Sequence, residues 1–380
     1  MNIYKTISLL IVLVTPIFAY SETAATSEDK SYTPKVFANF SAKYNTLDGL
    51  AIDSNGDIIA SVPNFNNDYL LEKGDITEVY PAVMAILNKD NEISDWYTFS
   101  TQDLHPETGK IGPMECEFGP DGNLYIADMQ VLWGGEHKSR VLRINIEDGK
   151  PVNMDVVVEG FIVANGLIWR GDTLYVTESI LKHEAAPKEG QQKAPLHSGV
   201  YAFSLAELQG DKITLTPYSE QAQDAHLAFT MVSTNRVGFG ADGIIVDDMG
   251  NMYTSIMEDG VIYKTSFDEN NKIVETVQFT DAPEMISSDG LAWDSARQSI
   301  YVADILGNAV HSVDLSGKVT TLHKNGDTDG ADGSLDEPVV LLVRDDQLIV
   351  VNMDLAWITP PGIAVNTEVE APYALSVIDL

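Results

Sequence analysis

Pairs of short apolar segments, each pair joined by a tight turn, recur along the chain. Alternating apolar positions in these segments predict paired β-strands, and turns such as DSNGDI and DDMGNM suit antiparallel hairpins. An Asp-Gly or Asn-Gly precedes the first strand of four such pairs. The four segments are LDGLAIDSNGDIIAS from Leu47, ANGLIWRGDTLYVTE from Ala164, ADGIIVDDMGNMYTS from Ala241 and SDGLAWDSARQSIYVAD from Ser288.

The strand pairs belong to a longer repeat of about 50 residues, with insertions. Two more strand-like runs follow a pair, as GVIYKTSF and KIVETVQF do after the pair from Ala241. Four antiparallel strands repeated six times predict an all-β, six-bladed β-propeller. A seven-bladed ring and a β-sandwich are the alternatives, and six matching units favour six blades.

The two ends of the chain are expected to close this ring together. The last unit lacks a clear fourth strand, and PKVFANF, which precedes the first unit, can supply it. Pairing of the N- and C-terminal strands would leave no open sheet edge at the seam. We therefore predict a single propeller domain over residues 34–380.

The residues ahead of this domain have the pattern of a targeting segment. Lys5 is followed by the apolar run ISLLIVLVTPIFA and by the small-residue motif Ala19-Tyr20-Ser21. This pattern predicts a signal peptide over residues 1–21 and a flexible leader over residues 22–33. We expect a periplasmic or secreted protein with no membrane attachment after cleavage.

Composition narrows the classes of partner. The chain carries 57 acidic against 23 basic residues, a net charge of −34, which disfavours binding to nucleic acid and to anionic membranes. Cys116 is the only cysteine, so no intramolecular disulfide can form. We expect Cys116 to be a buried core residue and the protein to be a monomer acting on a small molecule.

Equivalent residues at the starts of the six innermost strands should face one volume on the propeller axis. Five of the six carry side-chain oxygens, and the carboxylates among them repel one another unless they are protonated or bridged by a cation. Oxygen ligands favour a hard ion, Ca²⁺ before Mg²⁺ or Mn²⁺. Each Asp-Gly or Asn-Gly alone is a common turn sequence, and only their recurrence favours a metal site. The six residues are Asp48, Met114, Asn165, Asp242, Asp289 and Glu337.

ANGLIWRGDTLYVTES and ADGIIVDDMGNMYTSIMEDGVIYK resemble the third- and fourth-blade motifs of the senescence-marker-protein/gluconolactonase family. Its relatives include regucalcin, diisopropyl fluorophosphatase and, more distantly, paraoxonases. The resemblance extends over most of the mature chain and is sharp only in these two motifs. It implies a six-bladed propeller with a divalent metal on the axis, held by one Glu, two Asn and one Asp.

The resemblance assigns the metal ligands residue by residue. Asn165 matches the third-blade Asn and Asp242 the fourth-blade Asp, whereas Asp48 stands where the family has Glu. The second-blade Asn is replaced by Met114, and we expect Glu115 beside it, or water, to complete the site. Ca²⁺ is the expected ion, with Mg²⁺, Mn²⁺ and Zn²⁺ as alternatives.

The chemistry implied is metal-dependent hydrolysis of a lactone or related ester, with Asp242 as both ligand and general base. Asp289 is expected either to be an alternate ligand or to contact the ligands without binding the metal itself. Glu337 could have this second, supporting role. Two rival functions remain open: a phosphotriesterase-like hydrolase on the same site, and a non-enzymatic binding propeller with a structural metal. Asp128, Glu178 and Asp304 end second strands, where we expect hydrogen-bonding loop carboxylates.

The segment NGDTDGADGSLDEP, from Asn325, resembles a calcium loop. Asn325, Asp327, Asp329, Gly330 and Asp336 stand at positions 1, 3, 5, 6 and 12 of the EF-hand pattern. The pattern calls for flanking helices, whereas the flanks here are predicted to be strands, and the last position is Asp rather than Glu. An inter-blade loop without metal is the favoured interpretation, with a second Ca²⁺ site over 325–336 as the alternative.

Overall fold

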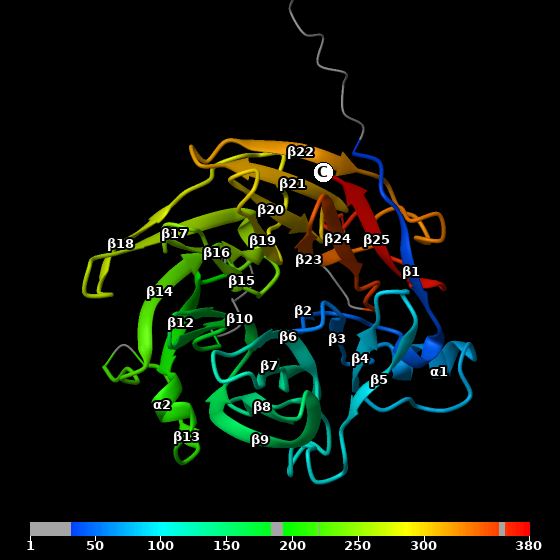
Figure 1. Ribbon diagram of the computed structural model, residues 1–380. Helices are drawn as coiled ribbons and strands as arrows, with labels where there is room; N and C mark the ends of the chain where they lie inside the picture. The colour runs from blue at the N-terminus through cyan, green and yellow to red at the C-terminus, as the bar shows by residue number, and fades with distance from the viewer. Residues whose placement is uncertain (1–31, 184–192, 220, 357–361) are drawn as a thin grey trace, which may run out of the picture. The chain divides into compact units, whose positions relative to one another are not determined.

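A computed structural model describes residues 32–183, 193–219, 221–356 and 362–380. The predicted signal peptide and residues 22–31 of the predicted leader lie outside the described residues. The described chain forms six sheets arranged as blades around an axis, with the innermost strands facing the centre (Figure 1). Each blade has four antiparallel strands, and one blade has a fifth strand that pairs in parallel. This confirms the predicted six-bladed β-propeller.

Blades 1 to 3 are built in chain order from the axis outward. A short strand, β13 (Ile213–Thr214), pairs in parallel with β9 (Lys150–Phe161), the outermost of the four main strands of blade 2. Blade 1 consists of β2 (Leu50–Ile52), β3 (Ile58–Val62), β4 (Val83–Leu87) and β5 (Ile93–Thr98). Blade 2 consists of β6 (Pro113–Phe118), β7 (Leu124–Asp128), β8 (Ser139–Glu147) and β9 (Lys150–Phe161). Blade 3 consists of β10 (Ala164–Arg170), β11 (Thr173–Glu178), β12 (Leu196–Ser204) and β14 (Leu227–Ser233).

Blades 4 and 5 repeat this order, and blade 6 takes its outer strand from the start of the chain. Blade 4 consists of β15 (Ala241–Val246), β16 (Met252–Ile256), β17 (Val261–Phe267) and β18 (Ile273–Gln278). Blade 5 consists of β19 (Leu291–Asp294), β20 (Ser299–Asp304), β21 (Ala309–Asp314) and β22 (Val319–Lys324). Blade 6 consists of β23 (Pro338–Arg344), β24 (Gln347–Asn352), β25 (Tyr373–Asp379) and β1 (Lys35–Phe40).

The predicted closure of the ring is confirmed by β1, which pairs antiparallel with β25. The register runs from Lys35 opposite Val377 to Phe40 opposite Tyr373. Phe40 is 4% exposed, so the closing strand contributes to the core as well as to the hydrogen-bond ladder. The N- and C-terminal segments of the domain therefore share one sheet.

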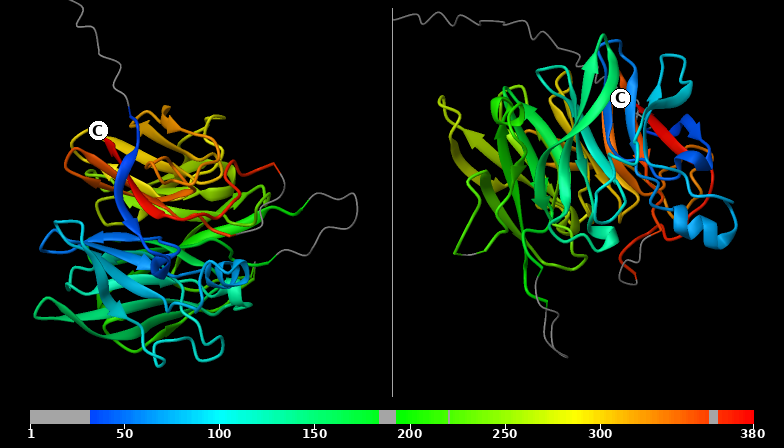
Figure 2. Two further views of the ribbon diagram at one scale, coloured as in Figure 1. Left: turned by 90° about the vertical axis from the view of Figure 1, so that its right-hand side faces the viewer. Right: turned by 90° about the horizontal axis from the view of Figure 1, so that it is seen from below.

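Helix is scarce in the described residues: α1 (Asn67–Lys73) and α2 (Leu205–Leu208) are the α-helices, with 3₁₀ turns at Ala42–Tyr44, Val131–Trp133 and Met257–Asp259. No helix among these residues has the length and apolar character needed to cross a membrane. Long connections, including the one that carries α1, lie on one side of the ring, opposite the tight hairpin turns (Figure 2).

The core lies between neighbouring blades. Apolar residues that alternate along each strand pack against the adjacent sheet, and the large fully buried side chains include Tyr125, Tyr253 and Phe161. Tyr125 packs edge-on against Trp169 of the next blade, with ring centroids 5.0 Å apart. The repeated tyrosine of the second strands is therefore a packing residue, which holds the innermost strands in place around the axis.

Candidate functional site: an acidic ring at the propeller axis

Two of the four Asp-Gly and Asn-Gly pairs, those of blades 3 and 4, lie at β-bulges of the innermost strands. Pairing shifts between Ala164 and Leu167 in blade 3 and between Ala241 and Ile244 in blade 4, which leaves the intervening pairs 165–166 and 242–243 out of the regular ladder. Blades 2 and 6 have the same irregularity at 114–115 and 339–340. A bulge redirects a side chain from the face of a sheet, and here it turns the first residue of each pair to the axis.

The glycine of each pair allows neighbouring innermost strands to approach closely. A Cβ added at Gly166 would lie 2.4 Å from the carbonyl oxygen of Asp242, and one at Gly243 would lie 2.5 Å from that of Asp289. Both contacts are with backbone, which cannot move without shifting the next blade. The recurrent dipeptide thus combines an axial side chain with a close backbone contact to the following blade.

The redirected side chains line a pocket of about 100 Å³ on the axis. Asp48, Asn165 and Asp242 are 4%, 8% and 5% exposed, and Asp289 is half-buried beside them. Apolar side chains from the loops and inner strands form the rest of the wall. These are Phe65, Met114, Met129, Leu132, Phe239, Met257, Ile305, Val339, Met353 and Leu355.

The carboxylates of this pocket have raised pKa values. Burial raises the pKa of Asp48 to about 7. Burial also raises the pKa of Asp242 well above its usual range, and the charge of Asp48 adds to the effect. The pKa of Asp289 is raised by burial and then by the charges of Asp242 and Asp48. No Lys, Arg or His is among the described residues that line the pocket, so protonation or a bound cation must relieve this repulsion.

The sixth position of the ring is occupied by Val339 rather than Glu337. Val339 lines the pocket. A Cβ added at Gly290 of the preceding blade would lie 2.4 Å from the carbonyl oxygen of Val339, so Val339 occupies the position that Asp242 and Asp289 occupy in their own blades. Glu337 has φ +54° and accepts a hydrogen bond through Oε2 from the backbone N–H of Leu355, at 2.7 Å. The register of the sixth repeat is therefore two residues later than the sequence alignment predicted, and Glu337 supports the loop that carries Leu355.

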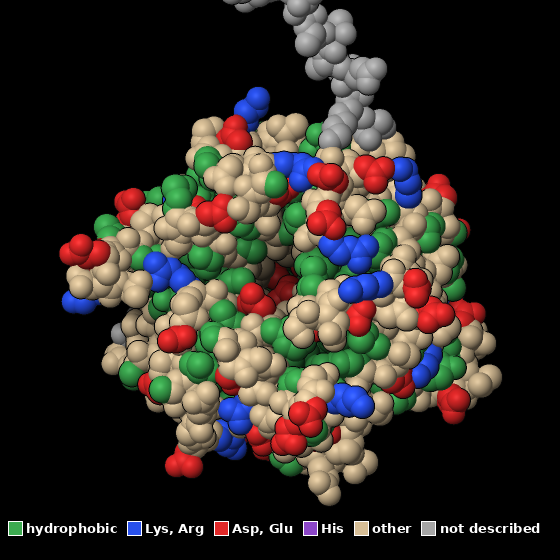
Figure 3. Space-filling model, viewed as in Figure 1, with side chains coloured by type: hydrophobic (Ala, Val, Ile, Leu, Met, Phe, Trp, Pro, Cys, Tyr) green, Lys and Arg blue, Asp and Glu red, His purple; other side chains and the backbone are tan. Residues whose placement is uncertain are grey.

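Glu115, also a predicted ligand, does not line the pocket with the other predicted ligands. It lines a hollow with Cys116, Glu117 and apolar residues of the innermost strands, and not the pocket that contains Asp48. Burial raises the pKa of Glu115 well above its usual value, and the charge of Asp48 contributes next. On the side of the ring with the tight turns, acidic side chains lie at the bottom of a central hollow (Figure 3).

The donor set of the axial pocket fits a hard cation in its chemistry. Asp48, Asn165 and Asp242 offer two carboxylates and an amide oxygen, and Asp289 offers a further carboxylate. Within the described residues, however, no three His, Cys, Asp or Glu side chains converge closely enough to hold a metal. The Asn165 amide or water would therefore have to complete any coordination shell in this pocket.

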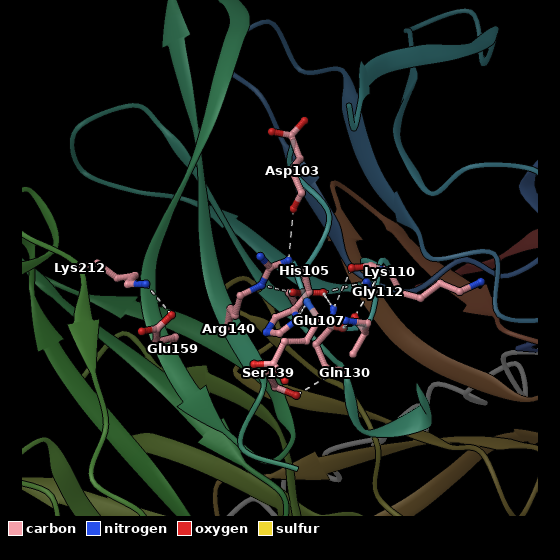
Figure 4. Close-up of polar contacts among 12 residues, drawn as sticks. Asp103, His105, Glu107, Lys110, Gly112, Gln130, Ser139, Arg140, Glu159 and Lys212 are labelled. Atoms are coloured by element: carbon pink, nitrogen blue, oxygen red, sulfur yellow. Dashed lines mark hydrogen bonds and ion pairs between the residues drawn. The ribbon is translucent and has the colours of Figure 1, made fainter. Parts of the chain in front are cut away.

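The carboxylates at the ends of the second strands are structural, as expected. Asp128 accepts hydrogen bonds from the N–H of Gly112 and from Gln130, and pairs with Arg140 at 2.6 Å. Figure 4 shows the surroundings of Arg140, whose side chain also donates a hydrogen bond to the carbonyl oxygen of Asp103. The Asp128 and Arg140 side chains are 0% and 4% exposed, so they form a buried ion pair.

Other blades use the same position in the same way. Glu178 accepts hydrogen bonds from the N–H groups of Ile162 and Val163, and Asp304 from those of Ile286 and Ser287. In every case the carboxylate holds the segment that leads into the innermost strand of its own blade. These residues position the axial ring without lining its pocket.

A larger pocket, of about 280 Å³, lies in the loops of blades 1 and 2. Its wall includes Asn67, Tyr80, Lys110 and Trp133, and it shares Phe65 with the axial pocket. The axial pocket remains the better candidate for chemistry, because its buried carboxylates converge from several blades. Sequence reasoning did not identify Phe65 or the other loop residues of the wall, because they belong to insertions that do not repeat.

Comparison with known proteins supports the fold and goes no further. No protein-family model matches the chain, and no curated protein is significantly similar in sequence. A gluconolactonase from Xanthomonas campestris is similar in structure, with a TM-score of 0.50, 11% identity, and coverage of 91% of this chain and 94% of that chain. A PQQ-bound aldose sugar dehydrogenase from Streptomyces coelicolor has a TM-score of 0.52, 12% identity, and coverage of 91% and 98%.

A luciferin-regenerating enzyme has a TM-score of 0.53 at 9% identity, with coverage of 91% of this chain and 96% of that chain. The chain thus has the fold of a broad group of six-bladed propeller enzymes that includes gluconolactonases. At such identities the likeness defines the architecture, and the reaction has to be argued from the site.

Proposed function

We propose that this chain is an exported, divalent-metal-dependent hydrolase of the lactonase type, as in the senescence-marker-protein/gluconolactonase family. The observation that carries the proposal is the group of carboxylates with raised pKa values, Asp48, Asp242 and Asp289, gathered in one pocket with Asn165. Burying several carboxylates together costs free energy unless an opposite charge compensates them. A cation would offset the repulsion and give the pocket a chemical function.

Asp48, Asn165 and Asp242 would hold the cation, with Ca²⁺ favoured over Mg²⁺, Mn²⁺ or Zn²⁺ because all the donors are oxygens. A cation bound there would polarise the carbonyl or phosphoryl oxygen of a substrate. Asp242 would also accept a proton from the attacking water as the general base. We place Glu115 below the ring, where the charge of Asp48 adds to the effect of burial on its pKa, and not among the ligands.

The wall of the pocket indicates the kind of substrate. Phe65, Leu132 and Phe239 are among the apolar side chains that surround the acidic floor. A ligand that combines a polar reacting group with an apolar substituent would satisfy both parts of this surface. We therefore favour a lactone or ester with an acyl or aryl group over an unsubstituted sugar lactone.

One observation supports a second candidate, a propeller that binds a ligand without turning it over. Met114 lines the pocket where the family's second-blade Asn is expected, so the pocket has one oxygen donor fewer than the family's catalytic site. In this second candidate the carboxylates hold a structural cation, and the loops bind a small molecule.

A substrate panel separates these candidates. The mature protein, loaded with Ca²⁺, would be assayed on sugar lactones, acyl lactones, aryl esters and phosphotriesters, with a chelator-treated sample as the control. We expect turnover of acyl lactones or aryl esters that is lost on chelation. Turnover confined to phosphotriesters would favour the phosphotriesterase alternative, and binding without turnover would favour the ligand-binding propeller.

A further inference from the structure

A second group of buried polar side chains lies beside blade 6, and none of its members lines the axial pocket. Asp336 lies near the end of the loop between β22 and β23, and Asp354 lies two residues after the end of β24. Asn366 and Glu370 lie in the segment that leads into β25. Two connections that are separate in sequence, β22–β23 and β24–β25, therefore contribute to one group.

Hydrogen bonds and charges show that these side chains are neighbours. Asn366 donates a hydrogen bond through Nδ2 to Oδ1 of Asp336, and the backbone N–H of Glu370 donates to Oδ2 of Asp354 at 3.0 Å. Burial raises the pKa of Asp336 to about 9, with the charges of Asp354 and Glu370 as the next causes. Burial likewise raises the pKa of Asp354 to about 8.

Three oxygens of this group are buried without a hydrogen-bond partner: Oδ1 of Asp354, Oδ1 of Asn366 and Oε2 of Glu370. Asp354 and Asn366 are only 2% and 1% exposed, so bulk water does not satisfy them. A buried oxygen without a partner is costly and uncommon, and each case calls for an explanation. Each of these oxygens belongs to a residue that is hydrogen-bonded to another member of the group.

We propose that Asp336, Asp354, Asn366 and Glu370 form a second cation site, which takes a hard divalent cation and favours Ca²⁺. Carboxylate and amide oxygens are ligands that Ca²⁺ prefers, and its flexible coordination of six to eight oxygens tolerates water in the remaining positions. Without the cation, the acidic side chains of the described residues stand too far apart to act together as ligands. Glu370, which is only half-buried, is the one that would move inward.

This site differs from the EF-hand pattern that the sequence suggested. Asp329 and Asp332 accept hydrogen bonds from the backbone N–H groups of Ala331 and Ser334, and Asn325 accepts one from Leu335. The loop's own polar side chains thus stabilise turns. Of the EF-hand positions, Asp336 is the one that belongs to the proposed ligand set, whose other members come from the C-terminal part of blade 6.

The position of the site suggests what the cation does. Asn66 of blade 1 donates a hydrogen bond to the carbonyl oxygen of Asp354 at 2.6 Å and accepts one from the N–H of Ala356 at 2.8 Å. Lys73 of α1 reaches the carbonyl oxygen of Val369 at 3.3 Å. A cation at Asp354 would therefore stabilise the junction between the last blade and the first.

The test counts calcium ions per chain. Metal-free mature protein is dialysed to equilibrium against CaCl₂, and protein-bound calcium is measured by elemental analysis. The nearly isosteric variant Asp354→Asn should bind one ion fewer than the wild type. The matched control Asp332→Asn, which changes one charge in the neighbouring loop, should bind the wild-type number. Asp242→Asn should retain the ion that Asp354→Asn loses, which separates this site from the axial one.

Stability provides a second readout. In chelator, Asp354→Asn should melt no lower than the wild type, because it replaces a buried carboxyl group beside other acidic side chains with a neutral amide. With calcium, the rise in Tm should be smaller than that of the wild type by roughly 2–4 °C. If Asp354→Asn folds poorly, Asp336→Asn takes its place in both measurements and should give the same results. A wild-type calcium count in both variants, or a wild-type protein that binds no calcium here, overturns the proposal.

Discussion

At the scale of single residues, the pair formed by an axial residue and the glycine after it determines how the site is built. Asp242 lines the pocket, while Gly243 lies against the backbone of Asp289 in the next blade. Sequence periodicity identified these pairs, because each must recur once per blade. It did not reveal that Val339 replaces Glu337, because the bulge in blade 6 has neither an acid nor a glycine to mark it.

We predict that Gly243→Ala destabilises the protein by about 1–3 kcal/mol. The added methyl group would lie 2.5 Å from the carbonyl oxygen of Asp289 and 2.8 Å from Cα of Gly290, so two blades would have to separate. Gly326→Ala is the matched control, because a Cβ there meets nothing within 4 Å. Urea denaturation compares the two variants, and equal stability would show that the close approach is unimportant.

At the scale of elements, alternation and tight turns predicted the blades because every strand pair obeys the same two constraints, a buried face and a hairpin. The closing strand β1 was predictable because the sixth unit lacked a partner for β25. Helix α1, strand β13 and the apolar wall of the pocket were not predictable in this way. They lie in insertions whose conformation depends on contacts made elsewhere in the fold.

We expect a chain that begins at Ser41 to be less stable than one that begins at Tyr32. The shorter chain lacks β1 and exposes the edge of β25, together with the surface that buries Phe40. The loss should be about 3 kcal/mol or more, as for removal of a buried phenylalanine, and the open edge should promote aggregation. Thermal unfolding and size-exclusion chromatography measure both effects. Equal melting temperatures would mean that blade 6 does not need its fourth strand.

At the scale of the whole molecule, acidic residues dominate both the surface and the axis. The net charge of −34 disfavours anionic partners and favours cations. Buried carboxylates occur in the axial pocket and again beside blade 6. The sequence indicated the first group through its repeat, whereas the second consists of residues from two connections that only the fold brings together.

We predict that the metal-free protein loses stability as pH rises from 3.8 to about 7, the usual and the folded-state pKa of Asp48. In this window the folded state binds more protons than the unfolded state, so the free energy of unfolding falls as pH increases. One such group contributes at most about 1.4 kcal/mol per pH unit. Calcium should flatten the slope, and Asp48→Asn should reduce it. Urea denaturation across this range measures it, and stability that increases with pH would contradict the account.

The central claim is that the axial carboxylates hold a cation and that Asp242 acts on water beside it. The most direct measurement titrates Ca²⁺ into metal-free wild type and Asp242→Asn and follows hydrolysis of the best substrate at each calcium concentration. The exposed Asp90→Asn serves as the charge-matched control. We predict that wild type and Asp90→Asn gain activity with calcium, and that Asp242→Asn loses at least about 100-fold in kcat, as expected for a general base. Hydrolysis that needs no divalent cation, or that survives in Asp242→Asn, would contradict the claim.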